Sequence, residues 1–381
     1  AHAIYRGPYE REVADSLRAL RLLTFEENGG IIAAPTTSLP EVIGGARNYD
    51  YRYVWLRDAG MIVSALTRAG SDGIEEQRFL DFICSAERDI EGLPLLPFYT
   101  LDGTPAPDDE SLDLAGYRGS RPVRTGNEAK IQLQLDALGN VLLAAKLIYN
   151  RFRTRAHWNI VEEVADYLAE NWREPDYGLW EELEQRQYTS SKVIVACGLD
   201  AIADHSESDE QARYWRSAVR DIREFIAQNC LNSEGAYAAV AGGEAVDVSA
   251  ALFPVWGYTD PNTPEILATM HALERDYREG HLYRRHLESF DSKEEGAFLA
   301  GTFWVAQYWV MRGDLVRARE ILDAGLGYAN DLGLFAEEAD PATGLMLGNF
   351  PQTFVHAAFI GAVIDLKTAL QRGVRDETQN G

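Results

Sequence analysis

Apolar residues recur at intervals of three and four along most of this 381-residue chain, which is the period of an amphipathic helix rather than of a strand. The first such segment, YEREVADSLRALRLLTF, covers residues 9–25. Strand signals are few and short, so the pattern predicts an all-α fold. Further helices are predicted near residues 58–70, 74–88, 127–150, 157–171, 189–205, 208–230, 263–277, 294–312, 314–329 and 351–372, with a weaker one near 246–252.

The connections between these helices are rich in Gly, Pro and Asp, and two of them are long. They are PFYTLDGTPAPDDESLDLAGYRGSRPVRTG (97–126) and AEEADPATGLMLGNFP (336–351). Loops longer than about 12 to 15 residues in a compact domain are usually functional. So many helices either stack in a solenoid or pair into a closed ring of hairpins, and the sequence shows no fixed-period repeat that favours the solenoid. The predicted fold is an (α/α)6 barrel with its loops gathered at one end.

The charge of the chain narrows the classes of partner. Sixty acidic residues against 36 basic ones give a net charge of −24, which repels nucleic-acid backbones and anionic membrane surfaces. A neutral, polyhydroxylated ligand is compatible with this charge. The three cysteines, Cys84, Cys197 and Cys230, are far apart and are expected to be reduced.

Neither a signal segment nor a membrane span is evident in the sequence. The first residues, AHAIYRGPYE, are not a basic and apolar leader, and no apolar run approaches the roughly 18 residues of a membrane span. The chain is therefore expected to be cytoplasmic, unless a leader was removed before Ala1. Separately, it is expected to be a monomer. No shift in composition divides it, so residues 1–381 are expected to form a single domain.

One stretch, NYDYRYVWLRDAG (48–60), places aromatic residues beside charged ones at the start of a helix. The adjacent Arg57 and Asp58 offer a donor and an acceptor to vicinal hydroxyls, and rings such as Tyr51 and Trp55 suit the C–H face of a sugar. The alternative is that Asp58 caps the helix and the aromatic residues belong to the core. Taken alone, the stretch favours this structural alternative.

Two pairs of adjacent glutamates are candidates for acid–base chemistry. Glu181 and Glu182 follow Trp180 in GLWEELEQRQ (178–187), and a second pair lies in LFAEEADPATG (334–344). A carboxyl group beside an aromatic face loses solvation of its charged form and keeps a proton near neutral pH, as a general acid requires. Any one such pair is nevertheless more often a solvated part of the surface.

Five segments taken together carry a resemblance to glycoside hydrolase family 15, which contains glucoamylases, glucodextranases and microbial trehalases. The resemblance covers about residues 31–360 and implies an (α/α)6 barrel that hydrolyses an α-glucosidic bond at a non-reducing end with inversion. Many bacterial members carry an N-terminal β-sandwich domain, which this chain is expected to lack. The five segments, in order, are RNYDYRYVWLRDAG, GYRGSRPVRTGNEAKIQLQLDALG, DYGLWEELEQRQYTSSKV, EEGAFLAGTFW and ANDLGLFAEEADPATGLMLGNFPQTFVHAAFI.

The resemblance implies catalytic roles for two of the glutamates. Glu181 matches the general acid and Glu182 a neighbour that binds the leaving sugar. Glu337 matches the catalytic base, but the adjacent Glu338 is equally acidic, so the choice between these two stays open and Glu338 is also a candidate substrate contact. The two catalytic carboxyl groups of an inverting enzyme are expected to lie roughly 6.5 to 9.5 Å apart.

The same resemblance implies a set of substrate contacts. Arg57 and Asp58 match the pair that grips the terminal glucose, and Tyr51 matches a tyrosine that places the catalytic water. The remaining candidate contacts are Trp55, Trp180 and Arg121. Neither a metal ion nor an organic cofactor is expected.

This sequence departs from the family pattern near the leaving-group site. Fungal glucoamylases have a tryptophan just before the Arg-Pro that corresponds to Arg121-Pro122, where this chain has Gly119-Ser120, and position 339 is Ala where many members have an aromatic residue. Short α-glucosides are therefore expected as substrates, with the α-1,6 bond of isomaltose preferred. The alternatives are α-1,4 glucosides, α,α-trehalose, and a non-catalytic sugar-binding protein. A barrel lyase or a phosphorylase does not account for the five segments.

Overall fold

The computed structural model describes residues 5–88, 90, 92–285 and 295–379. Its helices confirm the predicted all-α class. They are α1 (Glu10–Leu22), α2 (Leu56–Ala69), α3 (Ile74–Ser85), α4 (Leu135–Phe152), α5 (Trp158–Asn171), α6 (Thr189–Ala203), α7 (Asp209–Asn229), α8 (Pro264–Asp276), α9 (Leu299–Met311), α10 (Leu315–Leu326) and α11 (Thr353–Gln379), with short 3-10 helices η1 (Tyr117–Gly119), η2 (Glu128–Ile131) and η3 (Val248–Leu252).

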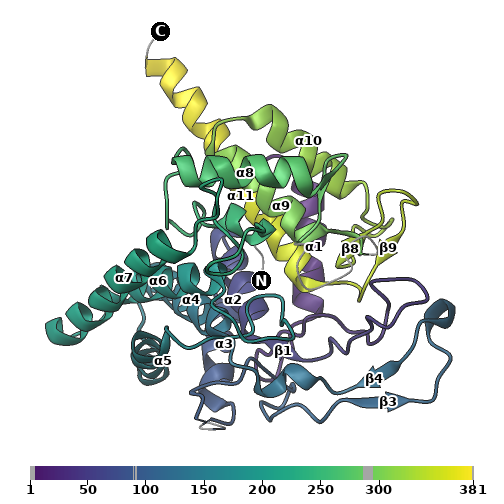
Figure 1. Cartoon of the computed structure of the whole chain (residues 1–381), viewed down its shortest axis with the longest axis horizontal. Coiled ribbons are helices and arrows are strands. Elements are labelled where there is room, and N and C mark those ends of the chain that lie inside the picture. The colour runs from purple at the N-terminus through teal and green to yellow at the C-terminus, as the bar shows by residue number, and fades with distance from the viewer. Residues whose placement is uncertain (1–4, 89, 91, 286–294, 380–381) are drawn as a thin grey trace.

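The helices alternate along the chain between an outer and an inner ring (Figure 1). In the inner ring α2 packs against α4 and α11, α4 packs against α6, and α9 packs against both α11 and η3. Each inner element is covered by an outer helix: α3 covers α2, α5 covers α4, α7 covers α6, α8 covers η3, α10 covers α9 and α1 covers α11. This double ring confirms the predicted (α/α)6 barrel, with η3 as its sixth and shortest inner element.

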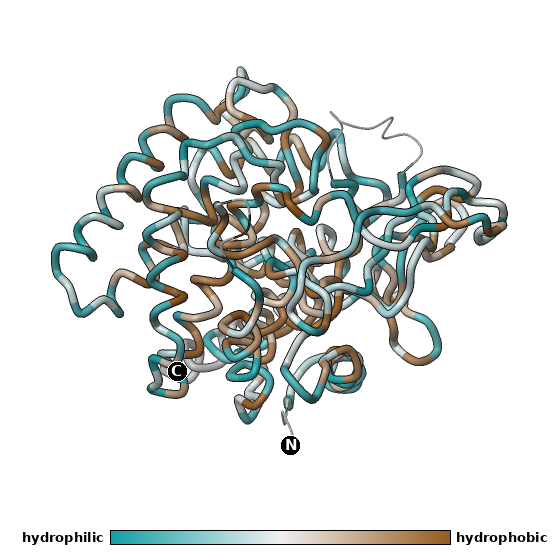
Figure 2. The backbone as a smooth tube through the Cα atoms, turned by 90° about the horizontal axis from the view of Figure 1, so that it is seen from below, coloured by the Kyte–Doolittle hydropathy of each residue, from teal (hydrophilic) through white to brown (hydrophobic). Residues whose placement is uncertain are grey.

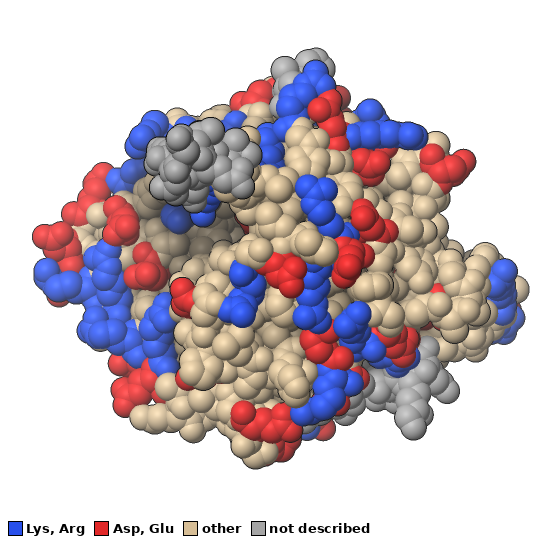
Figure 3. All heavy atoms as spheres, turned by 90° about the horizontal axis from the view of Figure 1, so that it is seen from above, with Lys and Arg blue, Asp and Glu red and all other residues tan. Residues whose placement is uncertain are grey.

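Hydrophobic patterning accounts for which helices lie inside. The inner helices α6 and α9 are apolar on nearly all sides and almost wholly buried, because neighbouring helices surround them. The outer helices α1 and α7 bury a single stripe and leave charged residues in solvent. Figure 2 shows the result, with hydrophobic segments in the centre and hydrophilic ones at the rim. On the face shown in Figure 3, acidic and basic side chains are interspersed.

The strands are short and belong to the loops. They form three antiparallel pairs and one three-stranded antiparallel sheet, and the strands labelled in Figure 1 lie on its right and lower side. The pairs are β1 (Val54–Trp55) with β2 (Phe98–Tyr99), β3 (Glu110–Leu112) with β4 (Val123–Thr125), and β5 (Arg278–Glu279) with β6 (Leu282–Tyr283); the sheet contains β7 (Ala297–Phe298), β8 (Glu338–Ala339) and β9 (Met346–Leu347).

The predicted helix at 127–150 begins later than its apolar pattern indicates, at Leu135. The preceding residues are held by contacts with the segment before α6. The carbonyl of Leu133 accepts a hydrogen bond from the N–H of Tyr177 (3.0 Å), and the carboxylate of Asp176 accepts one from the N–H of Leu135 (3.2 Å). These bonds replace helical ones and tie the start of α4 to the loop that carries Glu181.

The segment Thr353–Gly373 of α11 is long and apolar enough to cross a membrane by length and composition alone, although the sequence pattern indicates no such span. In the structure 72% of its apolar window is buried, and α11 packs against α1, α2 and α9. Its apolarity is that of a central helix enclosed by the barrel.

Candidate active site

A narrow pocket of about 50 Å³ opens where the inner helices begin. It lies at the N-terminal ends of α2, α9 and α11 and is closed by the loops before α6 and before β8. The structure brings seven of the predicted site residues to this pocket: Tyr51, Trp55, Arg57, Asp58, Trp180, Glu181 and Glu337. The loops thus gather at one end of the barrel. A larger cavity of about 690 Å³, lined mainly by residues of α2, α4, α9 and α11, contains none of the predicted site residues.

The Arg57–Asp58 pair is buried in the pocket. Arg57 donates from Nε to Asp58 Oδ1 (3.1 Å) and from Nη1 to Gln134 Oε1 (3.3 Å). Asp58 does not cap α2, whose N-cap position is Trp55 and carries no side-chain cap. Burial raises the pKa of Asp58 to about 6, although Arg57 opposes the shift. The structure therefore excludes the helix-cap alternative for Asp58 and brings both side chains to the pocket.

Glu181 is held in a strained turn. Its φ of 58° is left-handed, a conformation that costs a non-glycine residue about 1 kcal/mol or more. The backbone of the turn is fixed by hydrogen bonds from the N–H of Glu181 to the carbonyl of Gly178 (3.3 Å) and from that of Glu182 to the carbonyl of Tyr177 (2.9 Å). A strained backbone conformation persists only where the surrounding structure enforces it, and such positions are often found at functional sites.

The side chain of Glu181 contacts Trp55 rather than Trp180. The indole N–H of Trp55 donates to Glu181 Oε1, and Arg57 Nη2 lies 3.4 Å from the same oxygen. The indole of Trp180 instead donates to Asp247 and packs edge-on against Phe298. The aromatic ring in contact with the candidate acid thus comes from β1, immediately before α2.

The structure separates the adjacent glutamates at 337 and 338. Glu337 lines the pocket, and its Oε1 accepts a hydrogen bond from the hydroxyl of Tyr51 (2.8 Å). Glu338 lies behind the pocket, fully buried, and accepts a hydrogen bond from the N–H of Gly296 (3.1 Å). Glu337 precedes β8 and lines the pocket, whereas Glu338, the first residue of β8, does not. The structure therefore does not bring Glu338 to the predicted substrate position.

Burial shapes the chemistry of Glu337. Its side chain is 4% exposed, and burial, followed by the negative charge of Glu41, raises its pKa to about 8. The backbone of Gly348 approaches it closely, because a Cβ at this position, where φ is 79°, would lie 3.0 Å from Glu337 Oε2. The glycine therefore leaves room for the carboxyl group.

The two remaining predicted residues lie elsewhere. Glu182 is buried and lines a neighbouring pocket of about 260 Å³, which shares Trp180 with the first and also contains Tyr188 and Asp247. Arg121 is exposed on the long loop after β3 and lines neither pocket. Among the pocket residues absent from the sequence prediction are Arg285, Phe298, Gln352 and Phe354, of which Arg285 is the only charged one.

Comparison with known proteins identifies one family. A family model described as "Glycosyl hydrolases family 15" matches residues 7–317 and 316–364. The chain is 33% identical over 379 residues to a trehalase of Thermoplasma volcanium, a match that covers 96% of this chain and 60% of the relative. A trehalase of Mycobacterium tuberculosis is 34% identical over 374 residues, covering 94% of this chain and 54% of the relative. The chain thus spans just over half the length of these relatives.

Solved structures share the fold at lower identity. A glycosidase in complex with glucose superimposes with a TM-score of 0.76 at 19% identity, covering 93% of this chain and 96% of the other. A bacterial glucoamylase complexed with acarbose gives a TM-score of 0.74 at 18% identity, covering 95% of this chain and 57% of the other. These likenesses support the architecture.

Proposed function

This chain belongs to glycosyl hydrolase family 15, and on that premise we propose that it hydrolyses the α-glucosidic bond of α,α-trehalose with inversion. The substrate is supported by the trehalases among its relatives. The predicted preference for isomaltose has no support among them, whereas trehalose, which the sequence leaves as an alternative, does. The observation that carries the reaction type is the pair of carboxyl groups, Glu181 and Glu337, in one narrow pocket.

In the proposed mechanism Glu181 donates a proton to the glycosidic oxygen as the bond to C1 breaks. The carboxylate that remains keeps the indole N–H of Trp55 and the guanidinium of Arg57 as partners. These donors are already in place when the negative charge forms, so they stabilise it without reorganisation. In this mechanism Arg57 and Asp58 bind hydroxyl groups of the reacting glucose, one as a donor and the other as an acceptor.

Glu337 is the proposed base. It takes a proton from the water that attacks C1 from the side opposite the leaving group, and the new C1–O bond is therefore β. Tyr51 donates to Glu337 Oε1, while Oε2 has no hydrogen-bond partner among the described residues and is free to accept the proton of water. The separation of roughly 6.5 to 9.5 Å between the Glu181 and Glu337 carboxyls stays a prediction of this mechanism.

The adjoining pocket is the proposed site of the leaving glucose. It shares Trp180 with the narrow pocket and offers the carboxyl groups of Glu182 and Asp247, which suit hydroxyl donors. Because the narrow pocket is small and the second one is wider, a single terminal glucose enters first and the second sugar lies outside it. This order is the one that an exo-acting enzyme requires.

The test is proton NMR during cleavage of trehalose by the purified protein, with isomaltose and maltose in parallel. Inverting cleavage of trehalose gives one β-glucose from the attacked ring and one α-glucose from the departing ring, so the initial ratio is expected to be one to one. In water enriched in oxygen-18, the label is expected on the β-anomer alone. Two α-glucoses would contradict inversion, and faster cleavage of isomaltose would contradict the substrate.

A further inference from the structure

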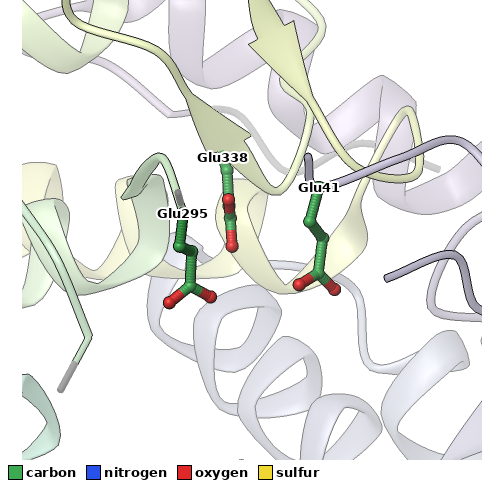
Figure 4. Close-up of side chains that lie close together, drawn as sticks. All are labelled: Glu41, Glu295 and Glu338. Atoms are coloured by element: carbon green, nitrogen blue, oxygen red, sulfur yellow. The ribbon is translucent and has the colours of Figure 1, made fainter. Parts of the chain in front are cut away.

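Behind the pocket, three glutamates from distant segments point their carboxyl groups into one buried space (Figure 4). Glu41 comes from the loop before β1, Glu295 from the segment before β7, and Glu338 from β8. Oxygens of the three lie within 4.8 Å of one another, and each residue is at most 4% exposed. Carboxyl groups so close together in a buried site need a source of positive charge.

Two arginines supply that charge. Arg285 Nη2 lies 3.0 Å from Glu41 and 3.6 Å from Glu338, and the same guanidinium contacts Glu295 through Nε at 2.5 Å. Arg47 lies 3.4 Å from Glu41 and 3.3 Å from Glu295. These guanidinium groups serve as the cations that three clustered carboxylates require, so the cluster is an ion-pair network.

The network contains more acids than bases. With Glu337 there are four carboxyl groups and two guanidiniums, so full ionisation would leave two uncompensated negative charges in a buried site, which is costly. Glu338 and Glu295 are hydrogen-bonded to each other. The pKa of Glu295 is lowered to about 2 because, although burial opposes it, two arginines favour its charge. The pKa of Glu338 is raised, by burial and then by Glu295, so Glu338 holds the shared proton.

The ionisation of Glu337 sets the remaining net charge of the network. Burial also raises the pKa of Glu41, while Arg285 and Arg47 oppose the shift. Because Glu41 and Glu295 each contact both arginines, they are the two carboxylates that balance Arg47 and Arg285 when Glu338 is neutral. Ionised Glu337 is then the excess charge. The groups that face it are the hydroxyl of Tyr51, the guanidinium of Arg285 and the carboxyls of Glu41 and Glu295, with Arg47 and Glu338 in the layer behind.

We propose that the carboxylate of Glu41, held between Arg47 and Arg285, controls the pH at which Glu337 becomes ionised, without touching substrate. Glu41 does not line the pocket, so it is a positioning residue that acts through the field at Glu337. A base works best when its pKa lies near the operating pH, and a buried negative charge beside a glutamate moves it in that direction. The inference rests on the proposed role of Glu337 as the base.

The test is the pH dependence of kcat/KM for trehalose. Removing the negative charge in Glu41→Gln is expected to move the acid limb of the profile to lower pH by about one pH unit. Arg47→Gln removes a positive charge and is expected to move the limb the opposite way. Glu41→Asp keeps the charge and is expected to keep the limb close to that of the native protein. Glu210→Gln, an exposed site on the outer helix α7, is the matched control.

A second readout separates this inference from the proposed function. In protein labelled with carbon-13 at the glutamate carboxyl, the resonance of Glu337 is assigned by its loss in Glu337→Gln, and its titration is followed by NMR in the native protein, Glu41→Gln and Arg47→Gln. A lower titration midpoint in Glu41→Gln and a higher one in Arg47→Gln support the inference whether or not trehalose is cleaved. An unmoved midpoint in both variants overturns it, even if β-glucose is released as proposed.

Discussion

The pocket has two walls, an acid wall that carries Glu181 and a base wall that carries Glu337. Buried acidic groups on the two walls are compensated by positive charge in different ways. On one wall a single guanidinium, that of Arg57, contacts Asp58 at 3.1 Å and Glu181 at 3.4 Å and lies 3.9 Å from Asp136. On the other wall two guanidiniums are engaged by glutamates behind the pocket, and the hydrogen-bond partner of Glu337 is the neutral hydroxyl of Tyr51. Arg57 thus contacts the candidate acid Glu181 directly. On the opposite wall, Arg285 contacts glutamates other than the candidate base Glu337.

This difference matches the opposite demands of the two roles. An acid that gives up its proton becomes negative, and a contacting guanidinium stabilises that product. A base must attract a proton, and a directly paired guanidinium would weaken that attraction. Arg57 and Arg285 are both buried arginines beside carboxylates, so residue type alone does not distinguish the walls. The distinction lies in which carboxyl group each guanidinium contacts.

The largest expected effect is the loss of either candidate catalytic carboxyl group. Glu181→Gln and Glu337→Gln keep the shape of the side chain and remove its acid or base function, so kcat for trehalose is expected to fall by roughly 10²- to 10⁴-fold. Circular dichroism and glucose binding, measured by calorimetry, are expected to stay close to those of the native protein. If either variant kept native turnover, that residue would have no role as acid or base.

A smaller loss is expected on the acid wall from Asp58→Asn. The variant retains the size of the side chain but exchanges a charged acceptor, bonded to Arg57, for an amide. Since hydrogen bonds to charged groups contribute about 1.5 to 3 kcal/mol, kcat/KM is expected to fall by about ten- to a hundred-fold, with weaker binding of glucose. Unchanged glucose affinity in a calorimetric titration would mean that Asp58 only holds Arg57.

Much of the barrel could be predicted from local pattern, because enclosed helices such as α9 are apolar throughout and outer ones such as α7 carry one apolar stripe. The start of α4 was predicted too early, since the pairing of Leu133 with Tyr177 is a contact between distant segments. The helix pattern at 246–252 is weak because the inner ring contains only the short 3-10 helix η3 at this position.

The site was predictable only in part for a similar reason. Resemblance predicted catalytic roles for Glu181 and Glu337, and both line the pocket. Which of the two adjacent glutamates at 337 and 338 faces the pocket depends on the folded backbone where β8 begins. Arg285 carries no local signal, because its partners Glu41, Glu295 and Glu338 meet only in the folded chain. Arg121 matched a motif, yet the loop that carries it leaves the side chain in solvent.

On the base wall, Tyr51→Phe tests the role of the Tyr51 hydroxyl through the pH dependence of kcat/KM. The hydroxyl of Tyr51 donates to Glu337 and lowers its pKa against the larger effect of burial. Without this donor the pKa of Glu337 is expected to rise, and the acid limb of kcat/KM is expected to move to higher pH, with a loss of about ten-fold below neutral pH. A limb that moved to lower pH would contradict the assignment of Glu337 as the group that must ionise.

The smallest expected effect is on thermal stability. It measures the free-energy cost of ionising the buried carboxyl group of Glu337. The pKa of Glu337 in the folded protein, about 8, lies above its ordinary value of 4.5, so between these values the folded state binds more protons than the unfolded state. Native stability therefore falls as pH rises through this window, and the full penalty is present above pH 8. Glu337→Gln removes the penalty, so its melting temperature is expected to exceed that of the native protein by about 2 to 4 °C at pH 9 and by less at pH 5. Calorimetry at both pH values decides the matter, because a gain that is equal at pH 5 and pH 9 would come from packing rather than from the charge.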